Sequence, residues 1–576
     1  MKKKVLSVVL ACAMVISLAA CGNKPAVEET EVKETQPTEK VDTEALVEAA
    51  AEENAEIPEL VDGKFAETRH ITVEIYDRGN DGGSDPTNNM YTDYIKKGML
   101  EDYNVEVEFV AVPRWTETDE INNLLAAGSA PDICLTYSYP TIQTYAGMGG
   151  VQDLAPLLVQ YRPALDNLYN WLGNTNIYWN LDDTTGTIWA IEGKRANSRR
   201  ILTFMRQDWL DALNLKAPTT KEEFYNCICA FRDNADTLLG ADASKMIPFS
   251  VSYDVGWRAA LLIESCIDPQ ITDKEFYVNG FDDRKLTQNG TKEAIRTLNA
   301  WYNEGLLWKD FALYSSGDTN EDDMIKAGYV GAFQHNWDYP FRNGEDSIQA
   351  NLQRMVGPDA KFVAVDCFEN ADGVTLKYVD STAGDRKIFF PTTNDEPLAS
   401  LLYLDWISDP EHIQYLQIGD EGVTHNVLPD GAIETIAAEG DAIMNSGQNI
   451  DMTITCNGLH LMDDNLTLLS SAHNYSNVDP ADVSLAITLS EANMKHAINV
   501  KTPPIVAEDG MGEALAAKRD IVYDTAVVAD PANFDQVWDD AIADYLASGG
   551  QAIIDERTTA WEGVYGDATA VPVTEE

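Results

Sequence analysis

The sequence predicts an α/β protein built from at least two lobes, and three observations support this prediction. The chain has 576 residues, more than a single hydrophobic core normally serves. Hydrophobic residues make up 44% of it, as in ordinary globular proteins. From residue 71 onward, patterns typical of strands and helices alternate with short connections. That alternation favours a parallel sheet with helices on its faces.

Five segments establish the alternation. Residues 71–75 place apolar side chains at every second position, which is the period of a strand. Residues 91–103 follow as a helix, and residues 105–109 alternate again as a second strand. A second helix covers residues 116–127 and a third strand covers residues 131–137. In parallel sheets, ligands meet the loops at the carboxyl ends of the strands, so we expect those loops to face a binding site.

Helices dominate farther along the chain. Thr219 and Glu222 have the spacing of a capping box, which predicts a helix start, and an apolar stripe that includes Phe224 follows. We expect this stripe to be core. Further helices are predicted over residues 291–301, 399–407 and 534–546.

The first residues of the chain have the features of an export signal. Three lysines precede an apolar run over residues 5–18, which is too short to span a bilayer as a helix. The run ends in Leu18-Ala19-Ala20-Cys21, which resembles the lipobox of bacterial lipoproteins. The resemblance implies a signal peptide over residues 1–20, lipid attachment at Cys21 and a position on the extracytoplasmic face of the cell membrane. An ordinary signal peptide, with Cys21 present by chance, is the alternative.

Residues 21–64 are rich in Glu and Ala and poor in large apolar side chains. Such a composition cannot offset the entropy of ordering, so we expect a disordered linker that tethers the folded part to its anchor.

The charge of the chain excludes some partners. It carries 95 acidic and 41 basic residues, for a net charge of −54, and loss of the three signal lysines would give −54 − 3 = −57. A field of that sign repels nucleic acid and anionic lipid headgroups, so we expect no nucleic-acid partner and contact with the membrane through the anchor alone. Six cysteines remain beyond Cys21, and none has the paired spacing of a metal site. We expect buried free thiols, with one disulfide as an alternative, and neither a metal nor a cofactor.

Several segments then resemble one family. Gly128-Ser129-Ala130-Pro131-Asp132-Ile133 is similar to a segment of the extracellular solute-binding proteins of ABC importers, in the sugar-binding group. Further similar segments follow in the same order, at residues 149–154, 187–191, 206–210 and 218–220. The resemblance covers roughly residues 68–565.

This resemblance implies a two-lobed fold like that of periplasmic binding proteins, with a ligand cleft between the lobes. We expect lobe 1 to comprise roughly residues 65–180 and 380–450, and lobe 2 residues 181–379 and 451–576. The implied function is capture of a carbohydrate, in particular an oligosaccharide, by hinge closure and delivery to the membrane permease of the importer. The binding protein itself is expected to be a monomer.

Relatives often bind calcium in an acidic loop just after the helix that begins near Phe224. In residues 233–242 of this chain, apolar residues interrupt the alternating oxygen ligands that calcium needs, so we expect no such site.

Candidate ligand-binding residues lie near strand ends or in segments that face the cleft in relatives. Sugars have flat apolar faces that stack on aromatic rings and hydroxyls that bond to charged and amide groups. Trp337 follows a strand of small residues, and ligand contact and a core position are both open for it. A basic cluster at residues 194–200 could meet an anionic ligand, although pairing with nearby acids is the stronger expectation. The candidates are Tyr76, Asp77, Arg78, Tyr137, Tyr139, Trp189, Trp257, Asn336, Trp337 and Asp338.

The sequence contains no nucleophile elbow, no Walker loop and no dinucleotide fingerprint. With 95 carboxylates, choosing a catalytic pair has no value. Binding without catalysis is therefore the favoured function. A cell-surface glycan hydrolase or lyase and a non-transport glycan adhesin are the alternatives.

Overall fold

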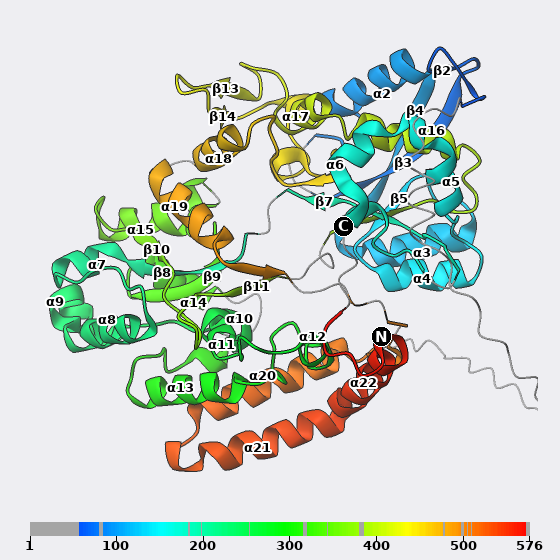
Figure 1. The fold of residues 1–576 in the computed structure, drawn as a ribbon. Coiled ribbons are helices and arrows are strands. Elements are labelled where there is room, and N and C mark those ends of the chain that lie inside the picture. Colours follow the sequence, from blue (N-terminus) through cyan, green and yellow to red (C-terminus); the bar gives the residue numbers. More distant parts are fainter. Residues whose placement is uncertain are drawn as a thin grey trace, which may run out of the picture.

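The structure is a computed structural model that describes residues 57–79, 84–182, 185–196, 199–252, 254–314, 319–342, 344–379, 385–475, 478–496, 500, 502–503, 505–508 and 510–571. It has two lobes, each with a large hydrophobic core of its own (Figure 1). The α/β two-lobed fold is thereby confirmed. The expected signal peptide and the expected lipid attachment at Cys21 lie outside the described residues.

Lobe 1 is organised around parallel strands. β3 pairs with β4 in parallel over its whole length, and a parallel bridge joins Val73 of β3 to Ile133 just before β5. Helices α2 and α16 contact this pair of strands, while α3 contacts β4 and β5. In the sheet β5–β12–β6, the central strand β12 comes from much later in the chain and pairs antiparallel with both neighbours. The elements of lobe 1 are β1 (Leu60–Val61), β2 (Lys64–Phe65), β3 (Arg69–Asp77), α2 (Met90–Tyr103), β4 (Val105–Pro113), α3 (Glu117–Ala127), β5 (Cys134–Thr136), α4 (Tyr139–Gly147), α5 (Ala155–Tyr161), α6 (Asp166–Ile177), β6 (Ile191–Glu192), β7 (Lys194–Arg195), β12 (Lys387–Phe389), α16 (Pro397–Trp406), α17 (Pro410–Ile418), β13 (His425–Val427), β14 (Ile433–Thr435) and β15 (Cys456–Asn457).

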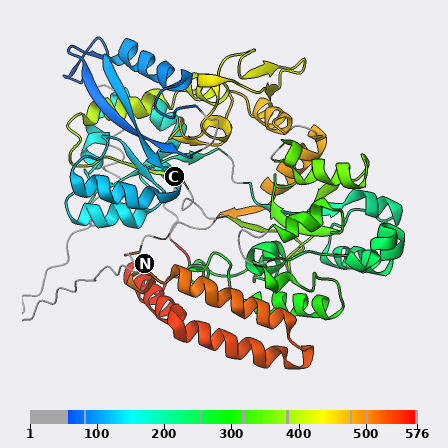
Figure 2. The same ribbon diagram turned by 180° about the vertical axis from the view of Figure 1, so that it is seen from behind.

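Lobe 2 contains a three-stranded antiparallel sheet in the order β10–β8–β9. Helices α10, α11 and α19 contact this sheet, and α20 packs against α13 and α21. Seen from behind, α20, α21 and α22 form a helical layer along the edge of lobe 2 (Figure 2). The elements of lobe 2 are β8 (Ile201–Arg206), α7 (Gln207–Ala212), α8 (Lys221–Asp233), α9 (Ala235–Leu239), α10 (Val255–Arg258), α11 (Ala260–Ser265), α12 (Asp273–Val278), α13 (Thr291–Asn303), α14 (Asn320–Lys326), β9 (Ala332–Asn336), α15 (Ile348–Val356), β10 (Phe362–Val365), β11 (Lys377–Val379), α19 (Pro480–Glu491), β16 (Met494–His496), α20 (Gly512–Val528), α21 (Phe534–Tyr545) and α22 (Gln551–Tyr565).

The chain passes between the lobes three times: between β7 and β8, between β11 and β12, and through helix α18 (Asp464–His473). Leu466 of α18 packs with apolar residues of lobe 1, whereas Ala472 belongs to the core of lobe 2. Helix α18 is thus shared by both lobes.

The crossings differ from the expected boundaries at 180 and 450. Ile191 and Cys456 belong to the core of lobe 1, so both crossings lie farther along the chain. The ordered part of lobe 1 also begins before residue 65, since β1 and β2 form an antiparallel hairpin inside the range expected to be linker. Leu60 and Phe65 pack against the core of lobe 1, which explains why these residues are ordered.

The local predictions for the early elements agree with the structure. Gly128 ends α3 in the left-handed conformation with φ 66°, which glycine adopts without strain. The predicted capping box is wrong by one residue. Thr220 is the N-cap of α8 and accepts a hydrogen bond from the Glu223 backbone N–H, while Glu223 accepts two from Thr219.

The apolar stripe of α8 is buried, as expected for core. The six cysteines beyond Cys21 are all free thiols, so the alternative of a disulfide is wrong; four of them, Cys134, Cys227, Cys367 and Cys456, are buried. None of the described helices is both long and apolar enough to cross a bilayer.

Candidate functional site: the pocket between the lobes

A pocket with a volume of about 210 Å³ lies between the two lobes. Lobe 1 contributes residues from β7 and from the segment 448–459, and lobe 2 contributes residues from the loop after β9. The end of α18 completes the wall. We call this cavity the interlobe pocket. It is lined by Arg195, Arg199, Trp337, Asp338, Gln448, Ile450, Asn457, Gly458, Leu459, Ser471, Asn474 and Tyr475.

Trp337 is the aromatic residue that the loop after β9 brings to this pocket. β9 is the edge strand of a buried sheet, and the chain turns directly after Asn336, so the next side chains leave the core. The Arg199 guanidinium lies 4.6 Å from the centre of the Trp337 ring, and the ring of Tyr475 meets it edge to face at 5.9 Å. Trp337 is only partly buried. The indole is therefore held from two sides while the pocket still reaches it.

Asp338 places a carboxylate beside this ring. The Tyr475 hydroxyl donates a hydrogen bond of 3.4 Å to it, and Arg342 lies 3.9 Å away. Burial raises the pKa of Asp338 above its ordinary value, and the Arg342 guanidinium opposes this shift. The interlobe pocket thus combines an aromatic face with a hydrogen-bonding carboxyl group.

The basic cluster at residues 194–200 reaches the pocket with two arginines. Arg199 pairs with Glu491 at 2.8 Å, and Arg195 pairs with Asp385 at 3.5 Å. Arg200 turns away and pairs with Glu264 at 2.8 Å. The expected pairing of the cluster with acidic residues is confirmed for these three arginines.

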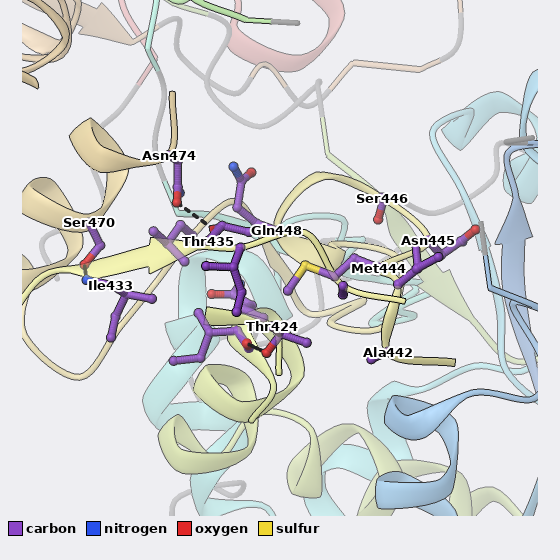
Figure 3. A pocket seen from close by; sticks show the side chains of 16 residues that line it. Thr424, Ile433, Thr435, Ala442, Met444, Asn445, Ser446, Gln448, Ser470 and Asn474 are labelled. Carbon is purple, nitrogen blue, oxygen red and sulfur yellow. Dashed lines mark hydrogen bonds between the residues drawn. The ribbon is translucent and has the colours of Figure 1, made fainter. Parts of the chain in front are cut away.

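A larger cavity of about 440 Å³ adjoins the interlobe pocket (Figure 3). We call it the hairpin pocket, because hairpin β13–β14 forms one wall. The Thr435 hydroxyl donates to Asn474 at 2.8 Å and the Ile433 backbone N–H donates to Ser470 at 3.0 Å, so this hairpin is tied to α18 and the residue after it. Many of its lining side chains are apolar, including Met444. The two pockets share Gln448, Leu459 and Asn474 in their walls and therefore adjoin each other.

Gln448 stands at the junction of the two pockets in an unusual backbone conformation. Its φ is 50° and that of Asn449 is 49°, a left-handed conformation that costs free energy in residues other than glycine. Asn449 is wholly buried and its amide donates to the Leu416 carbonyl at 2.8 Å, which holds the turn. Within the described part of the chain, the Gln448 carboxamide has no hydrogen-bond partner, and Figure 3 shows it pointing away from the hairpin pocket wall.

The candidates at the end of β3 are not part of this pocket. Tyr76 is wholly buried, and burial beside Glu74 and Glu117 raises its pKa far above the ordinary value. Arg78 binds both oxygens of Asp451, at 2.6 and 2.9 Å. Asp77 accepts a hydrogen bond from the backbone of Gly79. The expectation that Tyr76 contacts ligand therefore needs correction, because no surface of its side chain is exposed.

Three further candidates lie elsewhere on lobe 1. Tyr137 stacks with Tyr76, and the Arg114 guanidinium lies over both rings. The Tyr139 hydroxyl and the Trp189 backbone N–H both donate to the Asn180 side chain, at 3.2 and 2.8 Å, so these two residues brace one local cluster.

The last two candidates are on lobe 2. Trp257 packs against the core of lobe 2 with Arg284 over its ring. Asn336 ends β9 next to Trp337, and its backbone N–H bonds to the His335 ring. Of the ten candidates, only Trp337 and Asp338 line the interlobe pocket.

Residues 94–431 match the bacterial extracellular solute-binding proteins. The chain belongs to this family. It is 24% identical over 335 residues to the polygalacturonan/rhamnogalacturonan-binding protein YtcQ of Bacillus subtilis (strain 168), a match that covers 56% of this chain. The match spans 61% of YtcQ, which is less than two thirds of that relative's length.

Solved structures of solute-binding proteins share the fold. One is an "HMO binding ABC-transporter associated Solute Binding Protein" from Bifidobacterium longum infantis ATCC 15697. It superposes with a TM-score of 0.60 at 14% identity, and the match covers 88% of this chain and 100% of that protein. The S. pneumoniae protein FusA in complex with kestose gives a TM-score of 0.57 at 14% identity, with 87% and 100% covered. At such low identity these neighbours establish the two-lobed fold.

The segment that follows α8, where relatives often bind calcium, is helical in this solute-binding protein. Residues 235–245 fold into helix α9 and a 3-10 turn. Asp233 pairs with Arg232 at 2.8 Å and Asp242 pairs with Lys245 at 2.9 Å, so these carboxylates already have cationic partners. Among the residues that the structure describes, no cluster of His, Cys, Asp or Glu could hold a metal ion.

Sequence reasoning missed the residues that join the two pockets. Gln448, Leu459 and Asn474 lie in segments without strand periodicity. One signal could have indicated them: the run Asn445-Ser446-Gly447-Gln448-Asn449 is rich in amides and contains no charge, and side-chain amides are suited to bonding sugar hydroxyls. Nothing in the sequence alone places this run next to Trp337.

Proposed function

We propose that this protein captures an oligosaccharide in the interlobe pocket and delivers it to the membrane permease of an ABC importer. The single observation that carries the proposal is the pocket itself. It lies between two lobes and offers an aromatic ring beside a carboxyl group and several side-chain amides. An aromatic face binds the apolar side of a sugar ring, and amides and carboxyls bond its hydroxyls. The named ligands of relatives, a pectic polysaccharide and kestose among them, support the same class.

Trp337 and Asp338 are proposed to contact the sugar, with Gln448 and Asn474 bonding to a neighbouring unit at the junction of the pockets. The combined cavities, of about 210 and 440 Å³, lie within the range of small-ligand sites and leave room for more than one sugar ring. A catalytic function has no comparable support, because the family and its structural neighbours are binding proteins.

Two measurements test this proposal. Thermal shift of the purified chain against a panel of mono- and oligosaccharides should identify a stabilising sugar, because a ligand that binds only the native state raises its melting temperature. Small-angle scattering with that sugar should show a smaller radius of gyration, as closure around the ligand requires. The sugar must also be recovered unchanged. Failure of every sugar to stabilise the protein would reject the proposal, and appearance of hydrolysis or lyase products would favour the enzyme alternative.

The proposed location is the extracytoplasmic face of the membrane, with a lipid on Cys21. Replacing Cys21→Ser should release the protein from the membrane fraction or leave its signal uncleaved. Detergent partitioning identical to that of the unmodified chain would contradict the anchor.

A further inference from the structure

Both arginines that line the interlobe pocket already hold a carboxylate of the protein. Arg199 bonds to Glu491 at 2.8 Å, and its side chain is only 7% exposed. Arg195 lies 3.5 Å from Asp385, whose side chain is 5% exposed. The Arg195 pair is the looser of the two, because Asp385 also accepts hydrogen bonds from the Arg386 backbone and from Asn457. An anionic ligand would have to compete with these built-in anions for each guanidinium.

A third carboxylate faces the pocket directly. Asp338 lies beside Trp337, and its closest cation, Arg342, is 3.9 Å away. Among the described lining residues and their direct ion-pair partners, three guanidinium groups pair with three carboxylates. Asp385 also lies 3.6 Å from the Arg386 guanidinium, but that side chain is wholly buried, donates to the Thr453 and Cys456 carbonyls and does not line the pocket. The remaining cations of the basic cluster, Lys194 and Arg200, do not line the pocket. Lys194 places its ammonium over the Trp171 ring, and Arg200 pairs with Glu264. The described surroundings of the pocket therefore have no surplus of positive charge.

The field of the whole chain acts in the same direction. A net charge of −54 repels anions as they approach and lowers their local concentration. A protein adapted to anionic sugars would need a local positive surplus to overcome this field. The pocket has none among its described residues.

We infer that the ligand of the interlobe pocket is an uncharged oligosaccharide, and that uronic-acid chains are excluded because the cations of the pocket are occupied by the protein's own carboxylates. This rests on the proposed function and adds the charge class of the sugar. It separates this chain from its relative YtcQ, which is named for binding polygalacturonan and rhamnogalacturonan.

The first experiment compares sugars that differ in charge. Titration calorimetry of the full chain would use tetragalacturonate, its fully methyl-esterified form, tetramannuronate, maltotetraose, xylotetraose and β-1,4-galactotetraose. At least one uncharged tetramer should bind at least tenfold more tightly than either uronate, with an affinity that does not change between low and high salt. Tighter binding of a uronate than of every uncharged tetramer, weakened by salt, would overturn the charge assignment and leave the proposed function standing. Binding of none of these sugars would contradict both.

The second experiment releases one cation. Glu491→Gln keeps the shape of the side chain and frees the Arg199 guanidinium, so tetragalacturonate should bind at least fivefold more tightly than it does to the unmodified chain. Glu562→Gln is the matched control, because it removes the same charge from an exposed pair with Lys274 far along the chain on α22. Equal tetragalacturonate affinity in the Glu491→Gln variant and the control would overturn the inference that Glu491 blocks anions.

Discussion

Two strand ends, one in each lobe, carry an aromatic residue followed by an acid, yet the two aromatic residues differ in burial. The end of β3 and the residue after it read Tyr76-Asp77-Arg78, and the end of β9 and the two residues after it read Asn336-Trp337-Asp338. In lobe 1 the tyrosine is wholly buried and the arginine is held by both oxygens of Asp451. In lobe 2 the tryptophan and the acid line the interlobe pocket.

The difference comes from a third segment of the chain. Residues 445–451 cover the end of β3. The Asn445 amide donates to the Tyr76 carbonyl at 2.7 Å, and the Asp451 carboxylate accepts a hydrogen bond from Arg78 at 2.6 Å. The described contacts after β9 cover its residues less completely: Arg199 lies over the Trp337 ring and Tyr475 meets it edge to face, yet Trp337 and Asp338 both stay partly exposed. Position at a strand end is therefore not sufficient for a binding residue. The side chains must also remain uncovered by the rest of the fold.

The largest effect is expected from removing the partner of Arg78. Asp451→Ala leaves a mostly buried guanidinium without its carboxylate, and breaking such a pair costs about 3–5 kcal/mol. Urea unfolding followed by tryptophan fluorescence should show this loss. Arg342→Ala, which removes a longer and more exposed ion pair beside Trp337, should cost at most about 1 kcal/mol. Similar losses in the two variants would remove the distinction between the loops.

A second prediction compares carboxyl groups in the two lobes. Burial raises the pKa of Asp405, in the core of lobe 1, to about 6, against backbone and side-chain hydrogen bonds from Leu168 and Asn167. The folded state then binds more protons than the unfolded state between about pH 4 and 6, so the free energy of unfolding falls as the pH rises through this window. At about 1.4 kcal/mol per pKa unit, the loss above pH 6 is roughly 2–3 kcal/mol.

Asp405→Asn should flatten this dependence, which urea unfolding at pH 4.5 and pH 7.5 would measure. Asp242→Asn in lobe 2 serves as a control, because that carboxylate is exposed and its pair with Lys245 lies on the surface. If the Asp405→Asn variant and the unmodified chain lose the same stability between the two pH values, Asp405 is not the group responsible.

The third prediction concerns Trp337 itself. Trp337→Ala should lower the affinity for the sugar found by thermal shift by about 10–100-fold, or roughly 1.4–2.8 kcal/mol. Its stability cost should stay well under the ~3–5 kcal/mol of a fully buried aromatic residue. Tyr76→Phe, at the matching position of lobe 1, should leave the affinity unchanged. A large fall in melting temperature with normal binding would assign Trp337 to the core.

The smallest effect is expected at Gln448, in the same segment that covers the end of β3. Glycine adopts a φ of 50° without strain, so Gln448→Gly should hold or raise the free energy of unfolding by up to about 1 kcal/mol. The lost carboxamide should weaken sugar binding about 3–10-fold, a change of roughly 1 kcal/mol. Gln448→Ala is expected to lose the same affinity without the gain in stability. Full affinity in both variants would show that the ligand does not reach the junction of the pockets.

The sequence predicted the strands and helices whose patterns are complete within one local segment. The strands around Val73 and Val107 and the helix between them follow from apolar periods that are complete within each segment. The burial of Tyr76 could not be predicted in this way, because its contacts come from distant parts of the chain: its ring stacks with Tyr137, and its carbonyl accepts a hydrogen bond from Asn445, 369 residues away. The cap of α8 was misplaced by one residue because Thr219 and Thr220 offer the same side chain at adjacent positions. Trp337 was a candidate because it follows a strand of small residues, Gly331-Ala332-Phe333, in a segment that faces the cleft in relatives.

Helix α18 has a mechanical consequence. One part of it is embedded in lobe 1 through Leu466 and another in lobe 2 through Ala472, and it contacts both β14 and α19. Because this helix is anchored in both lobes, we expect the lobes to rotate about it more readily than they separate. Ser471 of α18 and Asn474 at its end line the interlobe pocket. We therefore expect the pocket walls near α18 to move least when the lobes rotate. The first sugar unit would then bind a surface that changes little on closure, and loops farther from α18 would make the larger movements.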